Sequence, residues 1–385
     1  MTVVLDAGDY PLTQYGISGI GLRVAELAAA LAHHLPVVVY SPATGNREPV
    51  DTGDAVLITE ARDWPQLLAT AAAVMFFDMP DLPRMQHAVA AGTVILSENT
   101  APVEQLEYPR LRPGGIFDTG AYQRLVDAYR YQLTHSQLLV ARSAIERLTA
   151  VANLAAYGLL DARDIATSRL LAHRILTIPL GFSHTTAAGL LPVSTARRRT
   201  EVLWTGGLWA FTDPVAAVRA VAAARARGTE VTLRFLHAAP HPDTAATTAA
   251  VTTAAADLGV AEHVLLHTDP IAHRDRDRSF THAAALICLA RPGIENQTCV
   301  RLRARDSRLY GLPLIVDPHG ATAVELAADE LAIPIDPDDT TGLADLLTRL
   351  VTPDASPPRH DAGTWAYEHT IAPLVAWLHD HLPPR

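Results

Sequence analysis

Guanidinium and carboxylate groups gather within one short part of the chain, residues 291–313. The two carboxylates are Glu295 and Asp306, and Arg301 and Arg303 lie between them. An apolar run ends there at a Pro-Gly pair, which predicts a strand, a loop that carries Glu295, and then a helix. A helix N-terminus and guanidinium groups bind phosphate, and a carboxylate accepts hydrogen bonds from sugar hydroxyls. These residue types therefore suit a diphosphate beside a sugar hydroxyl.

The spacing of the arginines predicts which of them reaches the phosphate. Arg301, Arg305 and Arg308 are spaced i, i+4 and i+7, so they would share one face of the expected helix. Arg303 would be turned from Arg301 by about 200°, so we expect only one of these two to contact phosphate directly. We expect Arg301 to be that residue, with Arg303 as the second choice. The alternative is a surface helix whose arginines are all solvated.

The composition excludes several classes of protein. The chain has 385 residues with 31 basic and 41 acidic side chains, and its net charge of −10 argues against nucleic acid as a partner. It contains no lysine, which excludes lysine Schiff bases, lysine-bound pyridoxal phosphate and a Walker-type phosphate loop. Any phosphate site must therefore be built from arginine, backbone amides and helix ends.

Targeting and metal motifs are not found in the sequence. No apolar run approaches the length of a membrane span, and residues 1–6 predict a first strand rather than a signal peptide. Cys288 and Cys299 make no disulfide framework, so we take a cytoplasmic location as the default. The histidines show no zinc-like spacing with the cysteines, and no metal site is predicted.

Short apolar runs alternate with helical segments in the first half of the chain, which predicts a parallel sheet covered on both faces. The expected strands are 3–5, 37–40, 55–59, 74–77, 94–96, 138–141 and 175–178. Ligands bind beyond the carboxyl ends of such strands, where Asp78, Glu98 and Asn99 are candidates for contacts with ligand hydroxyls. Each would serve equally as a helix cap or turn residue. The glycine-rich loop around Gly19 would let backbone approach a ligand, or would form only a tight strand-to-helix turn.

The same pattern restarts in the second half, so we expect two doubly wound domains. The expected strands are 201–205, 231–236, 264–266, 283–290, 314–316 and 331–335. Gly206 and Gly207 follow the first of these strands and open a loop that ends in Asp-Pro before a helix. Glycines at such a place let a phosphate approach the backbone closely. Residues 185–200 look like a linker, and we expect the domains to divide there.

The stretch from Glu295 to Pro313 resembles the donor site of retaining GT-B glycosyltransferases, in a form similar to family 4. Arg301, Arg303 and Asp306 follow Glu295 at six, eight and eleven residues, as in a subgroup of these enzymes, and a Gly-Leu-Pro closes the stretch. The two acids are eight residues apart in most relatives. The resemblance implies that Glu295 holds donor-sugar hydroxyls, that Asp306 holds the ribose hydroxyls, and that the arginines stabilise the departing diphosphate.

Two further stretches carry the resemblance. Residues 179–181, Pro-Leu-Gly, resemble the end of the first GT-B domain, and the loop 206–214 resembles the opening of the donor domain, whose two glycines admit the β-phosphate. This loop lacks the arginine and lysine that many relatives place there. The positive charge for the phosphate is therefore expected from Arg301 and Arg303.

The resemblance implies an α/β GT-B fold, with two Rossmann-like domains and the active site in a cleft between them. Residues 1–184 would form the acceptor-side domain, and residues 200–362 the domain that binds the nucleotide sugar. Residues 363–385 would form a helix that crosses back to the first domain. Gly19 would lie in a loop that faces the acceptor and the donor phosphate.

The implied function is transfer of a sugar from a nucleotide-diphosphate donor to a hydroxyl of a small molecule or glycan, with retention and without a metal or cofactor. The candidate catalytic residues are Glu295, Glu98 and Asp78. The departing phosphate would take the acceptor proton, so no carboxylate pair for double displacement is needed. A sugar-nucleotide 2-epimerase and a non-catalytic GT-B partner of another transferase stay open as alternatives. The sequence does not identify the base, the sugar, the acceptor or the oligomeric state, and glycan and antibiotic assembly fit equally well.

Overall fold

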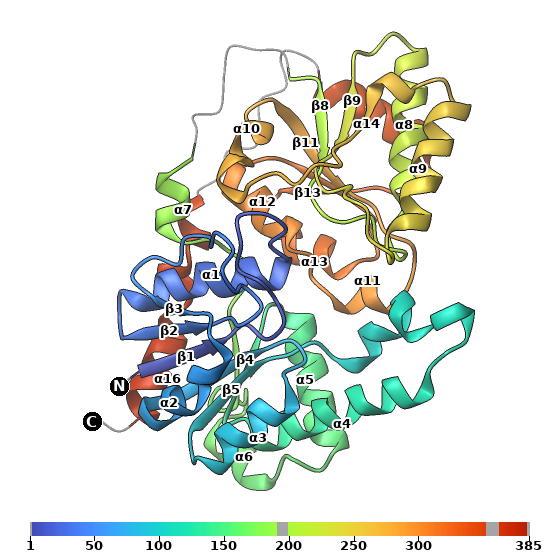
Figure 1. Cartoon of the computed structure of the whole chain (residues 1–385). Coiled ribbons are helices and arrows are strands. Elements are labelled where there is room, and N and C mark those ends of the chain that lie inside the picture. Colours follow the sequence, from blue (N-terminus) through green and yellow to red (C-terminus); the bar gives the residue numbers. More distant parts are fainter. Residues whose placement is uncertain (1, 191–198, 352–361, 383–385) are drawn as a thin grey trace. The chain divides into compact units, whose positions relative to one another are not determined.

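The computed structural model describes residues 2–190, 199–351 and 362–382. It divides into two compact units, each with its own sheet and helices (Figure 1). The first unit is built from the chain up to Pro102, from Thr119–Gly189 and from Gly363 onward. The second unit is built from Val103–Asp118 and from the described residues between Leu190 and Ala362.

The first unit holds a seven-stranded parallel sheet in the order β3-β2-β1-β4-β5-β6-β7. Its strands are β1 (Thr2–Asp6), β2 (Val37–Tyr40), β3 (Val56–Ile58), β4 (Ala71–Phe77), β5 (Val94–Glu98), β6 (Leu138–Ala141) and β7 (Ile175–Thr177). Its helices include α1 (Gly19–Ala32), α2 (Trp64–Thr70), α3 (Leu82–Ala90), α4 (Thr119–His135), α5 (Ala144–Ala156), α6 (Ala162–Thr167) and α7 (His184–Ala188). Val3 and Leu5 face one buried core and Val4 faces another, because side chains alternate along a strand. Both faces of the sheet are therefore covered.

The C-terminal segment completes the first unit. The helices α15 (Tyr367–Thr370) and α16 (Ala372–His381) add buried apolar side chains to the core that α1 covers. The Tyr367 hydroxyl is buried and accepts hydrogen bonds from the backbone N–H of Gly181, at 3.0 Å, and from Nη1 of Arg23, at 2.6 Å. These bonds fix the segment to α1 and to the chain that follows β7.

The second unit holds a six-stranded parallel sheet in the order β10-β9-β8-β11-β12-β13. Its strands are β8 (Glu201–Trp204), β9 (Thr232–Phe235), β10 (Val264–Leu266), β11 (Ala283–Cys288), β12 (Leu314–Val316) and β13 (Ala332–Pro334). Its helices include α8 (Pro214–Ala226), α9 (Ala245–Asp257), α10 (Asp277–Phe280), α11 (Ile294–Thr298), α12 (Arg303–Tyr310), α13 (Ala321–Ala327) and α14 (Thr340–Leu350). Residues 103–118, which come from the first half of the sequence, join this unit as the short 3-10 turns η2 (Pro102–Glu107), η3 (Pro109–Leu111) and η4 (Pro113–Gly115).

Two parallel sheets with helices confirm the predicted α/β fold class. The stretch 291–313 differs from the prediction, because the backbone becomes extended at Cys299 and two short helices, α11 and α12, replace the single expected helix. Glu295 lies in the first turn of α11 and not in a loop. Gly311 ends α12 with φ of 60°, a left-handed conformation that favours glycine. The expected linker 185–200 begins inside α7, and residues 191–198 lie outside the described part of the chain.

Across the three described ranges of the chain, no helix combines the length and the apolar character needed to cross a membrane.

Candidate active site

The carboxyl ends of β8 and β11, which are neighbours in the second sheet, bring the predicted donor-site residues together. The loop after β8 carries Gly206 and Gly207, and β11 leads into α11 and α12. Arg303 is the first residue of α12, and its Nη2 donates to the carbonyl oxygen of Gly207 at 3.3 Å. A Cβ atom at Gly206 would overlap the Arg303 guanidinium, so this approach requires glycine.

Arg303 is a buried cation without a carboxylate partner. Its side chain is 7% exposed, and it forms no ion pair with any described residue. Nη1 lies 3.2 Å from Sγ of Cys288, the guanidinium lies 5.3 Å from the ring centroid of Trp204, and buried Nε has no hydrogen-bond partner. Burial therefore lowers the pKa of Arg303 below its usual value. An incoming anion would supply the partner that the described residues leave out.

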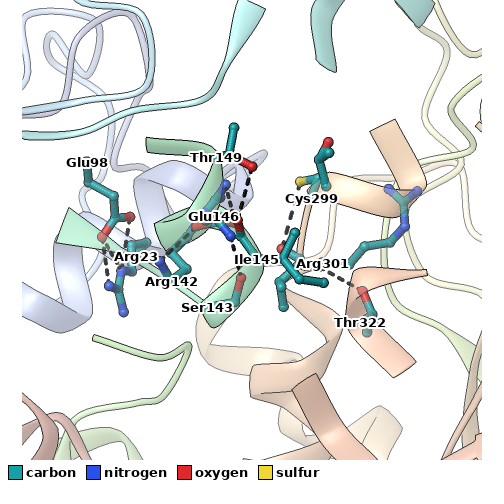
Figure 2. Close-up of polar contacts among 12 residues, drawn as sticks. Arg23, Glu98, Arg142, Ser143, Ile145, Glu146, Thr149, Cys299, Arg301 and Thr322 are labelled. Carbon is teal, nitrogen blue, oxygen red and sulfur yellow. Dashed lines mark hydrogen bonds and ion pairs between the residues drawn. The ribbon is translucent and has the colours of Figure 1, made fainter. Parts of the chain in front are cut away.

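Glu295 and Arg301 form a buried, two-pronged ion pair. Nη1 of Arg301 lies 3.0 Å from Oε1 of Glu295, and Nη2 lies 2.5 Å from Oε2. The Arg301 guanidinium also lies over the Phe211 ring, 4.9 Å from its centroid. The backbone N–H of Arg301 donates to the Thr322 hydroxyl of α13 at 3.0 Å, as Figure 2 shows. Arg301 precedes α12, so it shares no helix face with Arg305, and the expected geometry of a common face is wrong.

Asp306 is shared by two arginines. Oδ2 accepts from Nη2 of Arg276 at 3.0 Å, and Oδ1 accepts from Nη1 of Arg305 at 3.0 Å. Burial alone would favour the neutral acid, but the two guanidinium charges lower the pKa of Asp306 below its usual value. Asp306 is therefore ionised at neutral pH and is held in a fixed orientation.

The arginines of this stretch are not solvated, so the alternative of a surface helix is wrong. Arg301, Arg303, Arg305 and Arg308 are all buried. Arg308 points to a different set of acids, with Nε 2.9 Å from Asp329 Oδ2 and Nη2 3.1 Å from Glu325 Oε1. It anchors α12 to the region of α13.

The ion pairs leave positive charge in excess beside the glycine loop. Among the residues that the structure describes, Arg301 alone is paired with Glu295, two other arginines share Asp306, and Arg303 has no carboxylate partner. An unpaired buried charge is costly, and an anion with several oxygens would provide the missing partner. The arrangement can hold a diphosphate at Arg303 and the glycine loop, with a carboxylate for sugar hydroxyls beside it.

Two histidines near these arginines stay uncharged. His237 follows β9, and His273 begins the 3-10 turn η6 (His273–Asp275). Burial, reinforced by the positive charge of Arg276, lowers the pKa of His237 to about 4 and that of His273 to about 3. Both rings are neutral at pH 7 and add no positive charge.

In the first unit, Glu98 ends β5 and both of its carboxylate oxygens are engaged by Arg23 (Figure 2). Nη2 of Arg23 lies 2.7 Å from Oε2 of Glu98, and the same guanidinium donates to the carbonyls of Ile178 and Pro179. Glu98 thus joins α1 to β5 and to the chain after β7. Gly19 is the exposed first residue of α1.

Asp78 and Asn99 lie at the ends of the paired strands β4 and β5, and each has a side-chain atom without a partner. Asp78 has φ of +52°, a left-handed conformation that residues other than glycine rarely adopt. Its Oδ2 accepts from the Tyr10 hydroxyl, and its backbone N–H donates to the carbonyl of Glu98 at 2.7 Å. Among the described residues, nothing bonds to buried Oδ1 of Asp78 or to buried Nδ2 of Asn99. These two atoms can bind polar groups of a ligand.

Sequence reasoning missed two residues of the candidate site. Arg276 lies in the alternating-charge run 273–278, which predicts a solvated turn or the start of a helix, but its side chain is buried and paired with Asp306. No local pattern indicates this, because the partner is distant in sequence. The second residue is Cys288, the last residue of β11, whose thiol lies beside Arg303 at the carboxyl edge of the sheet.

Comparison with solved structures identifies the fold of the chain. No protein-family model matches the chain, and no curated protein matches it in sequence. Sucrose-phosphate synthase from Thermosynechococcus elongatus has a TM-score of 0.60 at 14% identity, covering 99% of this chain and 95% of that one. WaaG, a glycosyltransferase involved in lipopolysaccharide biosynthesis, has a TM-score of 0.61 at 14% identity, covering 98% and 99%. An alpha,alpha-trehalose-phosphate synthase (UDP-forming) from Burkholderia xenovorans has 0.58 at 14%, covering 98% of both chains. The chain therefore has the α/β GT-B fold found in glycosyltransferases.

Proposed function

We propose that this chain is a glycosyltransferase that moves a sugar from a nucleoside-diphosphate donor to a hydroxyl of an acceptor. The observation that carries the proposal is Arg303, a buried guanidinium without a carboxylate partner that lies against Gly206 and Gly207. The fold supports the proposal, since one similar structure is described as a glycosyltransferase and another as a UDP-forming synthase.

On the donor side, we assign one role to each group. Arg303 and the backbone of the glycine loop take the β-phosphate. Glu295, oriented by Arg301, accepts hydrogen bonds from hydroxyls of the donor sugar. Asp306 keeps lone pairs for the ribose hydroxyls, because each of its oxygens accepts only one arginine bond. The guanidinium charge then stabilises the negative charge that develops on the departing diphosphate.

On the acceptor side, Asp78 and Asn99 bind hydroxyl groups through the two atoms that lack partners. The bond between the sugar C1 and the phosphate oxygen breaks, C1 bonds to the acceptor oxygen, and the acceptor proton passes to the departing phosphate. We propose that attack occurs on the face of the leaving group, which retains the configuration at C1. One similar structure comes from a study of glycosyl transfer with retention by trehalose-6-phosphate synthase. Because guanidinium groups balance the diphosphate, the proposed reaction needs no metal ion.

A second candidate function is donor binding without transfer, as a partner of another transferase. The glycine loop 206–214 contains no cation, and Glu98, a candidate catalytic residue, is fully engaged by Arg23; both observations favour this candidate. The two functions differ in one measurable result, since only the first releases nucleoside diphosphate from a sugar nucleotide in the presence of an acceptor or water.

A thermal-shift screen with UDP, GDP, dTDP and ADP tests the shared part of both functions. A ligand at 100 times its Kd adds roughly 2.7 kcal/mol of stability, which for a unit of this size raises Tm by roughly 5–10 °C. We expect one diphosphate to give such a shift and the corresponding nucleoside to give much less. Equal shifts for nucleoside and diphosphate would contradict a site built around the phosphates.

A further inference from the structure

Residues 103–118 contact the proposed donor site, and the proposed function gives these contacts no role. The segment leaves the first unit after β5, docks on the second unit, and returns to the first unit at α4. At its centre, Oε1 of Glu107 accepts from the backbone N–H of Ile294 at 2.6 Å and from that of Glu295 at 3.3 Å. One carboxylate therefore holds the amides at the start of α11, next to the residue proposed to bind the donor sugar.

The same segment also packs against the glycine loop 206–214. The Tyr108 ring lies 5.2 Å from the Phe211 ring and 6.1 Å from the Trp209 ring, measured between centroids. Phe211 in turn carries the Arg301 guanidinium on its ring. Tyr108 thus contacts the loop after β8, against which Arg303 lies, and its neighbour Glu107 contacts the start of α11.

The Glu107 carboxylate lies close to the backbone of Gly293. A Cβ atom at Gly293 would lie 2.6 Å from both carboxylate oxygens of Glu107, which is too close for any side chain. The backbone of Gly293 is extended, with φ of −175°, so its conformation alone does not require glycine. With Glu107 in this position, a Cβ atom at residue 293 would fit only if the Glu107 carboxylate moved away.

The contact is held by few groups. Within the described ranges, no arginine or histidine forms an ion pair with Glu107, and its bonds go to uncharged amides. A second carboxylate, that of Glu295, belongs to the same turn, but it is paired with Arg301 and not with Glu107. A ligand whose own oxygens accept hydrogen bonds from these amides can therefore replace Glu107. Phosphate groups attached to such a ligand would bind to Arg303.

We propose that Glu107 is a specificity residue of the donor site, which occupies the amides of Ile294 and Glu295 until a sugar displaces it. The inference rests on the proposed function, because it takes the donor sugar to bind at Glu295. Glu107 discriminates between ligands: a nucleoside diphosphate binds at Arg303 without disturbing it, whereas a sugar nucleotide must displace the carboxylate. The segment 103–118 then moves off the site when the complete donor binds.

Calorimetry on the full chain tests this, with the nucleoside diphosphate found by thermal shift and the matching sugar nucleotide as probes. Glu107→Ala removes the competing carboxylate, so we expect the sugar nucleotide to bind about tenfold more tightly, as the loss of a charge-assisted hydrogen bond implies. The affinity for the diphosphate should stay within about twofold of wild type. Glu107→Gln keeps an oxygen that can accept a hydrogen bond but removes the charge. Its affinity for the sugar nucleotide should therefore lie between those of wild type and Glu107→Ala. This variant replaces Glu107→Ala in the test if Glu107→Ala does not fold. Glu262→Ala, on an exposed side chain of the same unit, is the charge-matched control and should behave as wild type.

An unchanged or weaker affinity of both Glu107 variants for the sugar nucleotide would overturn the inference while leaving the proposed function intact. Binding of neither probe to any variant would instead show that the proposed function has failed. Trypsin gives an independent readout, because the chain has no lysine and the bond after exposed Arg110 lies inside the segment. The sugar nucleotide should accelerate cleavage after Arg110 more than the diphosphate does, and protection of this bond by the sugar nucleotide would contradict displacement.

Discussion

Replacing Arg303 by methionine should weaken ligand binding without weakening the fold. This guanidinium is buried and has no carboxylate partner within the described ranges, so its charge contributes desolvation cost and little attraction. Methionine keeps much of the packing on Trp204. We expect the free energy of unfolding of Arg303→Met to stay within about 1 kcal/mol of wild type or to rise. The affinity for the nucleoside diphosphate should fall by roughly 10- to 100-fold, since a charge-assisted bond contributes roughly 1.5–3 kcal/mol.

Arg301→Met is the matched control, because it changes the same residue type two positions earlier. It removes the sole cation paired with Glu295 among the described residues and leaves that carboxylate buried. Breaking a buried ion pair in this way costs roughly 3–5 kcal/mol, so this variant should melt well below wild type. Urea unfolding and calorimetry on both variants separate the two effects. The reasoning is refuted if Arg303→Met binds the diphosphate as wild type does, or if it is as unstable as Arg301→Met.

Three further predictions concern the supports of the two units. Asp306→Asn should destabilise the protein by roughly 3–5 kcal/mol in urea unfolding, because two buried arginines lose their shared carboxylate; a change below about 1 kcal/mol would contradict this. Tyr367→Phe should cost about 1–3 kcal/mol by the same measurement, because Arg23 and a backbone amide lose their acceptor, and an unchanged midpoint would show that the hydroxyl contributes nothing. His237 and His273 have folded pKa values of about 4 and about 3, so the unfolded chain binds more protons as pH falls below about 6.5, and stability falls with it. Each should contribute about 1–2 kcal/mol of loss between pH 7.5 and pH 5, and melting curves of the double glutamine variant should show a weaker pH dependence than wild type.

The sequence was sufficient to predict the strands and to locate the glycine loop of the candidate site. Strands buried on both faces are continuous apolar runs, and such runs can be recognised without knowing what they pack against. Gly206 and Gly207 stand out in the sequence because a glycine pair directly follows a strand-like run. Gly311 ends α12 in a left-handed conformation, which glycine adopts readily, so a glycine after a helical run is a signal that the sequence itself contains.

The partners of the charged residues could not be predicted in the same way. Whether Arg301 or Arg303 has a carboxylate depends on the backbone path through Cys299, which breaks the expected helix and frees Arg301 to pair with Glu295. Ion pairing between Arg276 and Asp306 depends on how α10 and α12 pack, and local charge patterns contain no information about it.

The docking of residues 103–118 was missed for a related reason. The sequence divides into two halves of alternating strands and helices, and nothing in that pattern assigns a piece of the first half to the second unit. The contacts that hold the segment are a carboxylate on two backbone amides and a tyrosine on two aromatic rings. Every residue except proline has a backbone amide, so the sequence does not indicate which amides accept a carboxylate as a partner. Only the folded structure shows these contacts.

Turnover of the donor is the most direct test of the central claim that this chain transfers sugar. The purified protein would be incubated with the sugar nucleotide selected by the thermal-shift screen and a panel of hydroxyl acceptors, and released nucleoside diphosphate and glycosylated product would be measured by mass spectrometry. The account predicts diphosphate release by wild type, with loss of most of that rate in Glu295→Gln and in Arg303→Met. Tight donor binding with no diphosphate release above the Arg303→Met background would contradict it and would identify the chain as a binding protein instead.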